Sequence, residues 1–343
     1  MKAFVLHGVE DLRQQERKEP AVGEDDVLIR IRRTGICGSD VHYYKDYHIG
    51  SFIPQAPFVL GHEFSGDVVA VGKRVSAFSA GDRITAEPSI ECGRCAHCRS
   101  GRYNLCTNLK FIGTAATVPH IDGAFGEFVS VPSRKCYLLP ESLDYGAGAL
   151  VEPMAVGAHG VMRAGSIAGR RVLITGGGTI GQMVLAVARV VGAGEITVAD
   201  PDPFAREFSL SHGADFAIDP TEEGIGEKLF RDGGYEVLFE AAGSSAALGF
   251  CYQVAARGAT VVMVGNQPDS VTLNINLTVT KELSVHGSFR YAHVYPMVLD
   301  WMTKGRVAVN DLISVVYPYQ DFQAAMDRAV KKENVVKVQV EQQ

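Results

Sequence analysis

The 343-residue sequence contains no apolar run long enough to cross a bilayer and no long run of basic residues. Even the apolar stretch at 184–194 is interrupted by Arg189, so no transmembrane helix is expected. The net charge of −6 argues against nucleic acid or an anionic membrane surface as the main partner. Acidic residues appear by position 10, and no apolar core of signal-peptide length precedes them, which predicts a soluble, cytoplasmic protein.

Disulfides are not expected either, although four of the seven cysteines lie within the segment CGRCAHCRSGRYNLC. An odd number of cysteines fits a disulfide framework poorly, and cytoplasmic thiols stay reduced. The spacing Cys92-x2-Cys95-x2-Cys98-x7-Cys106 is instead typical of a closed, tetrahedral zinc site. An iron–sulfur cluster is one alternative, and plain thiols or disulfides are another. Four protein ligands leave no open position, so this zinc would stabilise a lobe and take no part in catalysis.

A second group of metal-ligand residues lies outside that cluster. A catalytic zinc takes three protein ligands and keeps a position for water or substrate, and Cys37, His62 and a carboxylate would supply such a set. Glu63 is one carboxylate candidate; Glu152, in an apolar stretch where an unpaired acid is costly, is the other. Taken singly, Cys37 is a small buried hydrophobe, His62 a core histidine, and Glu152 a helix-start carboxylate favoured by the dipole. Taken together, they predict a second zinc site.

A nucleotide-binding pattern occupies the middle of the chain. Residues 171–175 form an apolar strand, GGGTIG at 176–181 fits G-x-G-x-x-G, and 179–191 have the spacing of a buried helix. A second strand at 195–199 ends at Asp200. The glycines allow a tight turn and a close approach to a pyrophosphate, the helix N-terminus binds that anion, and the acid accepts a hydrogen bond from a ribose hydroxyl.

The strand-and-helix alternation continues beyond this motif. Further strand-like runs lie at 215–218, 235–243, 259–265 and 283–289, with helical stretches between most of them. This alternation predicts an α/β protein with a doubly wound, parallel Rossmann sheet. Asp200 favours NAD over NADP, because a carboxylate repels a 2′-phosphate; the nearby Arg206 is the contrary indication, since a movable arginine accepts a phosphate.

The first 150 residues have a different pattern. In EDDVLIRIRRTG, Val27, Ile29 and Ile31 alternate on one face of a strand, and SGDVVAVG, GDRIT and GEFVSV are further short strands. We therefore expect a second, mostly β catalytic domain at 1–150 that carries both cysteine sites, and an NAD-binding domain at 151–286. A helix in SFRYAHVYPMVLDWMTKGRV and a last strand in VVKVQVEQQ would return the chain, at 287–343, to the first domain.

These motifs together resemble the zinc-containing medium-chain dehydrogenases over essentially the whole chain. The stretch Gly61-His62-Glu63-x2-Gly66-x5-Gly72-x2-Val75 matches the zinc signature of that family position by position. The cysteine cluster and the glycine motif with Asp200 follow in the expected order. The resemblance implies an enzyme with a GroES-like first domain, catalytic and structural zinc, NAD as cofactor, and a homo-oligomeric assembly, a tetramer or a dimer.

The resemblance also implies roles for individual residues. Cys37, His62 and Glu63 would bind the catalytic zinc, with Glu152 bound through water or alternating with Glu63. Ser39 and His42 would relay the proton, and Tyr43 and Glu152 complete the implied catalytic residues. The implied substrate residues are Tyr43, Phe111, Arg290 and Tyr291. The implied cofactor residues are Gly176, Gly178, Thr179, Ile180, Gly181, Asp200, Val264, Ser288 and Arg290.

Within this family, the stretches CGSDVHYY, SGRYNLC, LVEPMAVG and GSFRY are most similar to the polyol dehydrogenases (sorbitol, xylitol, L-iditol) and to L-idonate 5-dehydrogenase. Glu152 stands where ethanol-type enzymes have a cysteine. SGRYNLC is more like the polyol branch, whereas PHIDGAF is more like the idonate branch. The predicted function is hydride transfer from a secondary alcohol of a sugar polyol to NAD, and oxidation of a sugar acid is the alternative. A zinc-free reductase or a non-catalytic NAD-binding protein would not need the complete set of ligand and relay residues.

Overall fold

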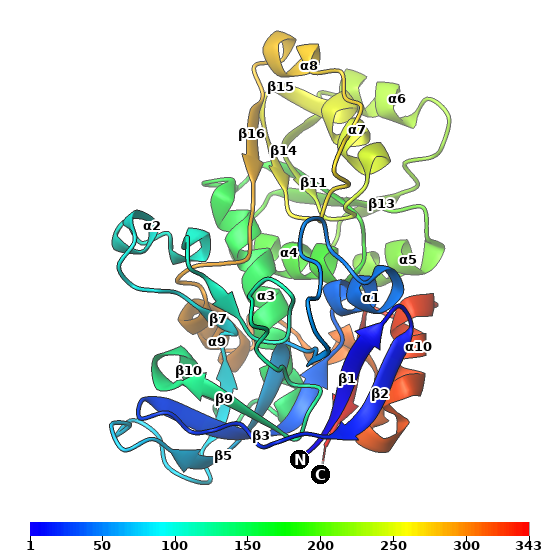
Figure 1. The fold of residues 1–343 in the computed structure, drawn as a ribbon. Helices are drawn as coiled ribbons and strands as arrows, with labels where there is room; N and C mark the ends of the chain where they lie inside the picture. The colour runs from blue at the N-terminus through cyan, green and yellow to red at the C-terminus, as the bar shows by residue number, and fades with distance from the viewer. Residues whose placement is uncertain (343) are drawn as a thin grey trace. The chain divides into compact units, whose positions relative to one another are not determined.

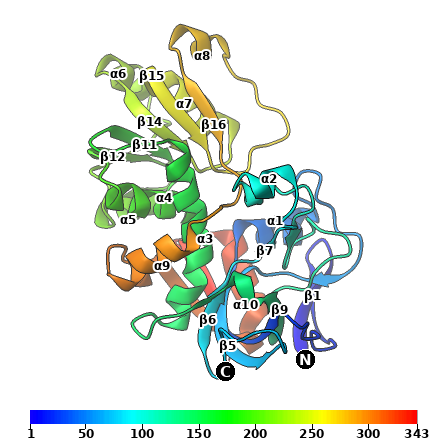
Figure 2. The same cartoon turned by 90° about the vertical axis from the view of Figure 1, so that its left-hand side faces the viewer.

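The computed structural model describes residues 1–342, and the chain divides into two compact units (Figure 1, Figure 2). Unit 1 comprises Met1–Glu152, Tyr295–Lys304 and the chain from Val309 onward. Unit 2 comprises Pro153–Val294 and Gly305–Ala308. Unit 1 is therefore assembled from both ends of the sequence, whereas unit 2 is almost entirely one continuous segment.

Unit 1 is mostly β. Its strands are β1 Lys2–Gly8, β2 Asp11–Glu16, β3 Asp26–Gly35, β4 Phe58–Val59, β5 Glu63–Val71, β6 Arg83–Ala86, β7 Ser89–Ile90, β8 Lys110–Phe111, β9 Phe128–Pro132, β10 Cys136–Leu138, β17 Ile313–Pro318 and β18 Lys337–Glu341. The main sheet has the order β10-β6-β5-β3-β18-β17, and β9 pairs with the first half of β3. A smaller sheet has the order β2-β1-β4, and β7 pairs with β8.

Strand β3 is the centre of the main sheet. Val27, Ile29 and Ile31 are fully buried, as their alternation predicts, and they pack with Phe64 and Val68 of β5. Burying each such side chain contributes about 1.5–3 kcal/mol. Strands β3 and β5 are antiparallel, and β3 also pairs with β18 near the C-terminus. The end of β3, the start of β5 and the start of β18 are therefore held in a fixed frame.

Unit 2 is a single parallel sheet with helices. Its strands are β11 Arg171–Thr175, β12 Glu195–Ala199, β13 Phe216–Ile218, β14 Tyr235–Glu240, β15 Ala255–Met263 and β16 Ser284–Gly287. Their order is β13-β12-β11-β14-β15-β16, and every described pair is parallel. This confirms the predicted doubly wound sheet, with its switch point between β11 and β14. Strand β14 ends at Glu240, earlier than the predicted run to 243.

Two helices of unit 2, α5 and α7, begin at side-chain caps that the sequence supplies. Asp202 accepts a hydrogen bond from Phe204 N at 3.0 Å ahead of α5, and Ser244 accepts one from Ala247 N at 3.2 Å ahead of α7. The helices are α1 Gly38–Asp46, α2 Ala96–Arg99, α3 Tyr145–Arg163, α4 Thr179–Val190, α5 Pro203–Ser211, α6 Ile225–Arg231, α7 Ser245–Val254, α8 Asn276–Thr280, α9 Tyr295–Thr303 and α10 Phe322–Lys331. Among the described residues, no helix is both long and apolar enough to cross a membrane.

Candidate metal centres and nucleotide site

The four clustered cysteines lie in the segment between β7 and β8, which also carries α2. The Sγ atoms of Cys92, Cys95, Cys98 and Cys106 are all within 4.8 Å of one another. Cys95 and Cys98 are 3.5 Å apart, and Cys92 and Cys98 are 4.0 Å apart. A tetrahedral centre with Zn–S bonds of about 2.3 Å requires sulfur–sulfur distances of about 3.8 Å. The spacing therefore fits a single zinc ion; all seven cysteines, each within the described residues, are free thiols rather than disulfides.

The ionisation of the four clustered thiols also favours a bound cation. Backbone N–H groups of Cys98 and Thr107 lower the pKa of the Cys95 thiol to about 5. Partial burial, and then the neighbouring sulfurs, raise the pKa of the Cys98 thiol to about 12. A cation among the sulfurs would stabilise negative charge on several of them at once, and Zn2+ is a cation that thiolate ligands select.

A buried polar network ties this cysteine lobe, residues 92–109, to the main sheet of unit 1. The Glu87 carboxylate, just beyond β6, accepts hydrogen bonds from Lys135 Nζ at 3.1 Å and from Tyr103 OH at 3.2 Å. Lys135 also pairs with Glu91 at 2.5 Å. The side chains of Glu87 and Lys135 are at most 5% exposed. Tyr103 of the lobe is therefore bonded to a group that the sheet holds in place.

The second predicted centre forms where β3 ends and β5 begins. The register pairs Gly35 with Glu63, which brings Cys37, two residues after β3, beside His62. Ligand atoms of Cys37, His62 and Glu63 all lie within 4.8 Å of one another. A Cβ atom on Gly35 would lie 2.1 Å from Glu63 Oε2, and one on Gly61 would lie 2.4 Å from the Phe125 ring. Gly35 and Gly61 are therefore required by close packing.

A lysine that the sequence analysis did not identify holds one of these ligands. Lys337 Nζ lies 2.8 Å from both Glu63 carboxylate oxygens and 3.1 Å from Ile36 O. The two side chains are only 2% and 1% exposed. Burial opposes the charge on the lysine, but Glu63 and then Cys37 raise the pKa of Lys337 above its ordinary value. The only signal in the sequence is a lysine within the apolar strand VVKVQV.

Replacing Lys337 by methionine would leave the Glu63 carboxylate buried without its cation. Removing one partner of a buried ion pair costs about 3–5 kcal/mol, so we expect zinc-free Lys337→Met to unfold about 10 °C below the zinc-free wild type. Zinc bound beside Glu63 would replace the missing positive charge and should recover most of this loss. Thermal unfolding with and without zinc measures the effect.

The matched control for this variant is Lys45→Met, because Lys45 pairs with Glu10 at the surface. An exposed, solvent-screened pair contributes little to stability, so this variant should unfold close to the wild type with or without metal. An equal loss of stability in zinc-free and zinc-loaded Lys337→Met would show that Glu63 does not face the metal.

A second residue missed by the sequence analysis, Asp40 of α1, faces the histidine. Asp40 is fully buried; its Oδ2 accepts a hydrogen bond from Cys37 N at 2.9 Å, and its Oδ1 lies 3.6 Å from His62 Nδ1. Neither Asp40 Oδ1 nor His62 Nδ1 has a hydrogen-bond partner within the described chain. Burial raises the pKa of Asp40 to about 6. With Nδ1 facing a carboxylate, Nε2 is the His62 nitrogen that would bind a metal, an arrangement typical of ligating histidines.

Three other predicted residues lie close to this centre. Ser39 Oγ is 3.4 Å from His62 Nε2. The Phe111 ring centroid lies 5.7 Å from that of His62. Glu152 is 5% exposed. Burial opposes a charge on His62, whereas Asp40, then Cys37, and to a smaller extent Glu152 raise its pKa, to about 10. A half-buried thiol and buried carboxylates that stabilise a proton on His62 would also stabilise a bound cation.

The remaining predicted residues of α1 have different surroundings. His42 has a side chain that is 56% exposed, and its Nδ1 lies 3.2 Å from Asp46 Oδ2. Tyr43 is 1% exposed, and its hydroxyl accepts a hydrogen bond from Ala115 N at 3.3 Å. His42 is thus placed to exchange protons with solvent, while Tyr43 is packed within unit 1.

The glycine motif connects β11 to α4 in unit 2. Gly176 has φ +93°, and a Cβ atom on Gly181 would lie 1.8 Å from Gly176 O, so this turn needs glycine at both positions. Gly177 N donates to Asp200 Oδ2 at 2.7 Å, which places the predicted ribose acceptor directly beside the motif. The other predicted residues of the motif lie at the start of α4: Gly178, Thr179 and Ile180.

The other predicted unit 2 residues lie at the same edge of the sheet. Val264 directly follows β15, and Ser288 directly follows β16. Arg290 and Tyr291 come next in the chain; the Arg290 guanidinium lies 4.8 Å from the centre of the Phe289 ring, and Tyr291 is buried. Val264 and Ser288 therefore lie at the carboxyl ends of parallel strands, where open α/β sheets bind their ligands.

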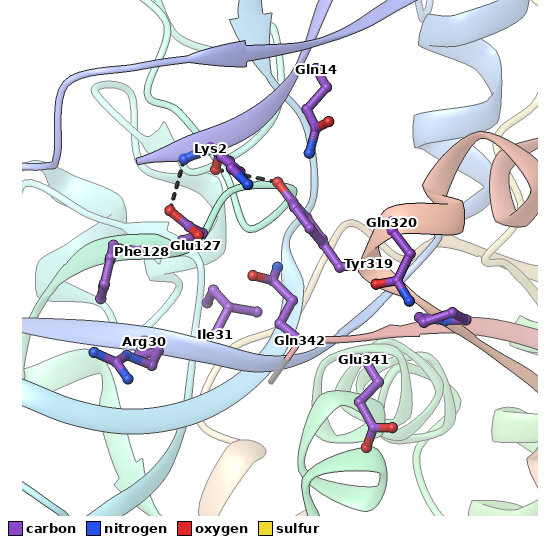
Figure 3. Close-up of a pocket in the computed structure, with 11 residues that line it drawn as sticks. Lys2, Gln14, Arg30, Ile31, Glu127, Phe128, Tyr319, Gln320, Glu341 and Gln342 are labelled. Carbon is purple, nitrogen blue, oxygen red and sulfur yellow. Dashed lines mark hydrogen bonds between the residues drawn. The ribbon is translucent and has the colours of Figure 1, made fainter.

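Unit 1 also has a cavity of about 500 Å³ that none of the predicted site residues lines (Figure 3). Hydrogen bonds between side chains and the backbone connect its walls: Tyr319 OH donates to Lys2 O at 3.2 Å, and Lys2 N donates to the Glu127 carboxylate at 2.7 Å. It contains no cysteine or histidine. The candidate site is therefore identified by its side-chain chemistry and not by this cavity.

Comparison with known proteins gives matches along most of the chain. Residues 23–141 match the alcohol dehydrogenase GroES-like domain, and residues 179–304 match the zinc-binding dehydrogenase domain. The chain is 36% identical over 338 residues to sorbitol dehydrogenase of Bacillus subtilis, covering 97% of this chain and 95% of that protein. It is also 36% identical over 334 residues to D-xylulose reductase A of Aspergillus niger, covering 95% and 92%.

A solved structure shows the same likeness in three dimensions. The crystal structure of L-idonate 5-dehydrogenase from Escherichia coli K-12 superimposes with a TM-score of 0.93 at 31% identity, covering 99% of this chain and 97% of that one. The matches confirm the predicted fold class, a GroES-like domain with a Rossmann sheet, and the predicted enzyme class, a zinc-dependent dehydrogenase. The chain belongs to the zinc-binding, medium-chain alcohol dehydrogenase family.

Proposed function

We propose that the protein is an NAD-dependent dehydrogenase that oxidises a secondary alcohol of a sugar polyol. The observation that carries this proposal is the convergence of the Cys37 thiol, the His62 imidazole and the Glu63 carboxylate within 4.8 Å. The relatives named for sorbitol and D-xylulose support the polyol class. In this proposal the segment 1–150 is the catalytic domain, 151–286 binds NAD, and 287–343 returns to the catalytic domain.

The side chains of the second centre fit a catalytic zinc. Cys37 and His62 would bind the metal, with Glu63 or Glu152 as the third ligand. Glu63 has a carboxylate oxygen within 4.8 Å of the ligand atoms of Cys37 and His62. Both of its oxygens, however, accept hydrogen bonds from Lys337 Nζ. Bound zinc supplies Lewis-acid chemistry that eases the loss of a proton from an alcohol, and NAD supplies the hydride acceptor. The four cysteines of the lobe would hold the structural zinc.

The residues of α1 would conduct the released proton. Ser39 and His42 are spaced i, i+3 and therefore share one face of the helix. Ser39 lies against His62, while the His42 side chain is 56% exposed. A hydroxyl at the inner position can accept and release a proton, and an exposed imidazole at the outer position can pass it to solvent. Tyr43, Phe111, Arg290 and Tyr291 are proposed to recognise the substrate.

Asp200 is proposed to select NAD. Its carboxylate already lies beside the glycine motif, 2.7 Å from Gly177 N. Arg206, the nearby arginine that could bind a 2′-phosphate if it were movable, donates instead to Asp200 O at 2.7 Å and Pro201 O at 2.8 Å. The arginine is therefore held at the backbone, and the carboxylate is the group that a cofactor would meet.

Asp200→Asn should weaken the preference for NAD. The amide keeps the shape of the side chain and one acceptor, but it loses the charge that binds the ribose and repels a phosphate. A hydrogen bond to a charged group contributes about 1.5–3 kcal/mol, so we expect the ratio of kcat/KM for NAD to that for NADP to fall about tenfold to a hundredfold. Glu207→Ala, at an exposed carboxylate of α5, is the control. An unchanged ratio in Asp200→Asn would contradict the assignment.

The substrate class is tested by NADH formation at 340 nm on zinc-quantified protein. The panel contains sorbitol, xylitol, L-iditol, galactitol and L-idonate, each with NAD and with NADP. Turnover of a neutral polyol with NAD would support the proposal and assign Arg290 to hydroxyl recognition. Turnover of L-idonate alone would support the second candidate, a sugar-acid dehydrogenase, which the likeness to L-idonate 5-dehydrogenase favours; Arg290 would then pair with a carboxylate.

A further inference from the structure

Glu240, the last residue of β14, is a fully buried carboxylate whose described partners are all neutral amides. Its Oε1 accepts hydrogen bonds from Ala242 N at 3.0 Å, Gly243 N at 2.7 Å and Ser244 N at 3.4 Å, and its Oε2 accepts one from the Gln267 side chain. Three successive backbone N–H groups directed at one oxygen fix the path of the turn 241–244. The burial of a carboxylate is costly, so these bonds are what make the position tolerable.

The turn that Glu240 holds packs directly against the glycine motif. Ala241 N donates to Thr175 O at 2.8 Å. A Cβ atom on Gly176, the first glycine of the motif, would lie 2.7 Å from Ala242 N and 2.9 Å from Ala242 Cα. Any shift of the turn toward β11 would therefore displace the glycine loop.

Glu240 also joins this turn to the segment after β15. Val264 N and Gly265 N donate to Glu240 O at 2.8 and 2.9 Å. A Cβ atom on Gly265 would lie 2.4 Å from Gly243 N, and one on Gly243 would lie 2.4 Å from Asn266 O. The backbones at the ends of β11, β14 and β15 are therefore in contact. Glu240 forms hydrogen bonds with the turn 241–244 after β14 and with the segment 264–267 after β15.

The contact between the turn 241–244 and the glycine motif lies where a dinucleotide would bind. The turn 176–178 after β11 and the turn 241–244 after β14 lie on the two sides of the switch point of the sheet, which is where doubly wound folds bind dinucleotides. We propose that Glu240 is a positioning residue for the cofactor: it fixes the turn 241–244 against the glycine motif and joins it to 264–267, so that the carboxyl edge of the sheet is shaped before the dinucleotide binds. This inference rests on the nucleotide-binding role proposed above for unit 2.

The test compares NADH affinity in two substitutions at this position. Glu240→Ala removes every bond from the carboxylate, so the dissociation constant of NADH, measured by fluorescence titration, should rise about tenfold or more. Glu240→Gln keeps an oxygen for the three backbone N–H groups. Its new amide nitrogen can bond Gln267 Oε1, which is buried and has no partner among residues 1–342. This variant should bind NADH within about threefold of the wild type.

Glu236→Ala is the matched control, because Glu236 lies on the same strand but is 46% exposed and pairs with Arg170. It should leave NADH affinity unchanged. A folded Glu240→Ala, shown by thermal unfolding, that binds NADH like the wild type overturns the inference. If Glu240→Ala does not fold, Gln267→Ala takes its place: a rise of about threefold in the dissociation constant supports the inference, and an unchanged constant overturns it. Failure of the wild type to bind NADH would instead count against the proposed function.

Discussion

Cys37→Ser is expected to lower the turnover of the preferred polyol by at least about a thousandfold, which corresponds to about 4 kcal/mol of transition-state stabilisation. A serine hydroxyl is a poor zinc ligand at neutral pH, since metal binding requires a deprotonated donor such as a thiolate. The substitution is nearly isosteric and lies at the start of α1, where serine is a favourable N-cap residue. The loss should therefore appear in catalysis and zinc content and not in folding.

Two measurements separate this result from a general loss of structure. The dissociation constant of NADH should stay within about twofold of the wild type, because the glycine motif and Asp200 belong to unit 2. Cys136→Ser is the matched control: Cys136 is buried in β10 and lies outside both cysteine-containing clusters, so the variant should keep its zinc and its turnover. Full activity in Cys37→Ser protein that has lost one zinc per chain would disprove the assignment of the catalytic metal.

Cys95→Ser should instead lower stability, by about 10 °C or more in the unfolding temperature. Within the cysteine lobe, only Asn104 and Cys106 are buried, so the lobe has no apolar core of its own. The metal would supply most of the free energy that keeps it ordered, as in small zinc domains. Loss of the lobe would also remove Tyr103 from Glu87 and leave the Glu87–Lys135–Glu91 network open to water.

Limited proteolysis provides a second measurement for this variant. Without its zinc, the lobe should become the first site of cleavage, between residues 92 and 109, while the rest of the chain stays protected. Turnover at low temperature should fall much less than in Cys37→Ser, because the second centre keeps its ligands. If Cys95→Ser unfolds at the wild-type temperature and retains two zinc ions per chain, the lobe does not depend on a metal.

Part of this arrangement could be predicted from the sequence because the signals are local. Strands β11 and β12 begin and end where the apolar runs at 171–175 and 195–199 do, since a parallel strand buried on both faces is a continuous apolar run. The end of β14 could not be predicted from the sequence. In YEVLFEAAG, only small apolar residues follow Glu240 as far as 243, so the sequence does not mark where the strand ends. In the structure, the Glu240 carboxylate accepts hydrogen bonds from the amides that follow it, and the chain turns there.

Lys337 and Asp40, which lie against the proposed metal ligands, were not predicted because their partners are set by tertiary pairing. Lys337 is separated from Glu63 by more than half of the chain, and they meet because β18 and β5 pair with the same end of β3. Asp40 faces His62 only once α1 follows β3 in the observed register. Ligand types and spacings are readable from the sequence, whereas the groups that hold the ligands depend on the sheet.

The central claim is that zinc held at Cys37 and His62 enables an NAD-linked oxidation of a sugar polyol. The most direct test measures NADH formation from sorbitol and xylitol before and after a chelator removes the more weakly bound zinc, and again after zinc is returned, with the metal content of each sample determined. The proposed function predicts two zinc ions per chain at the start, loss of activity in step with the first zinc removed, and its recovery on addition of zinc. Undiminished NADH formation by protein that contains no zinc would contradict it.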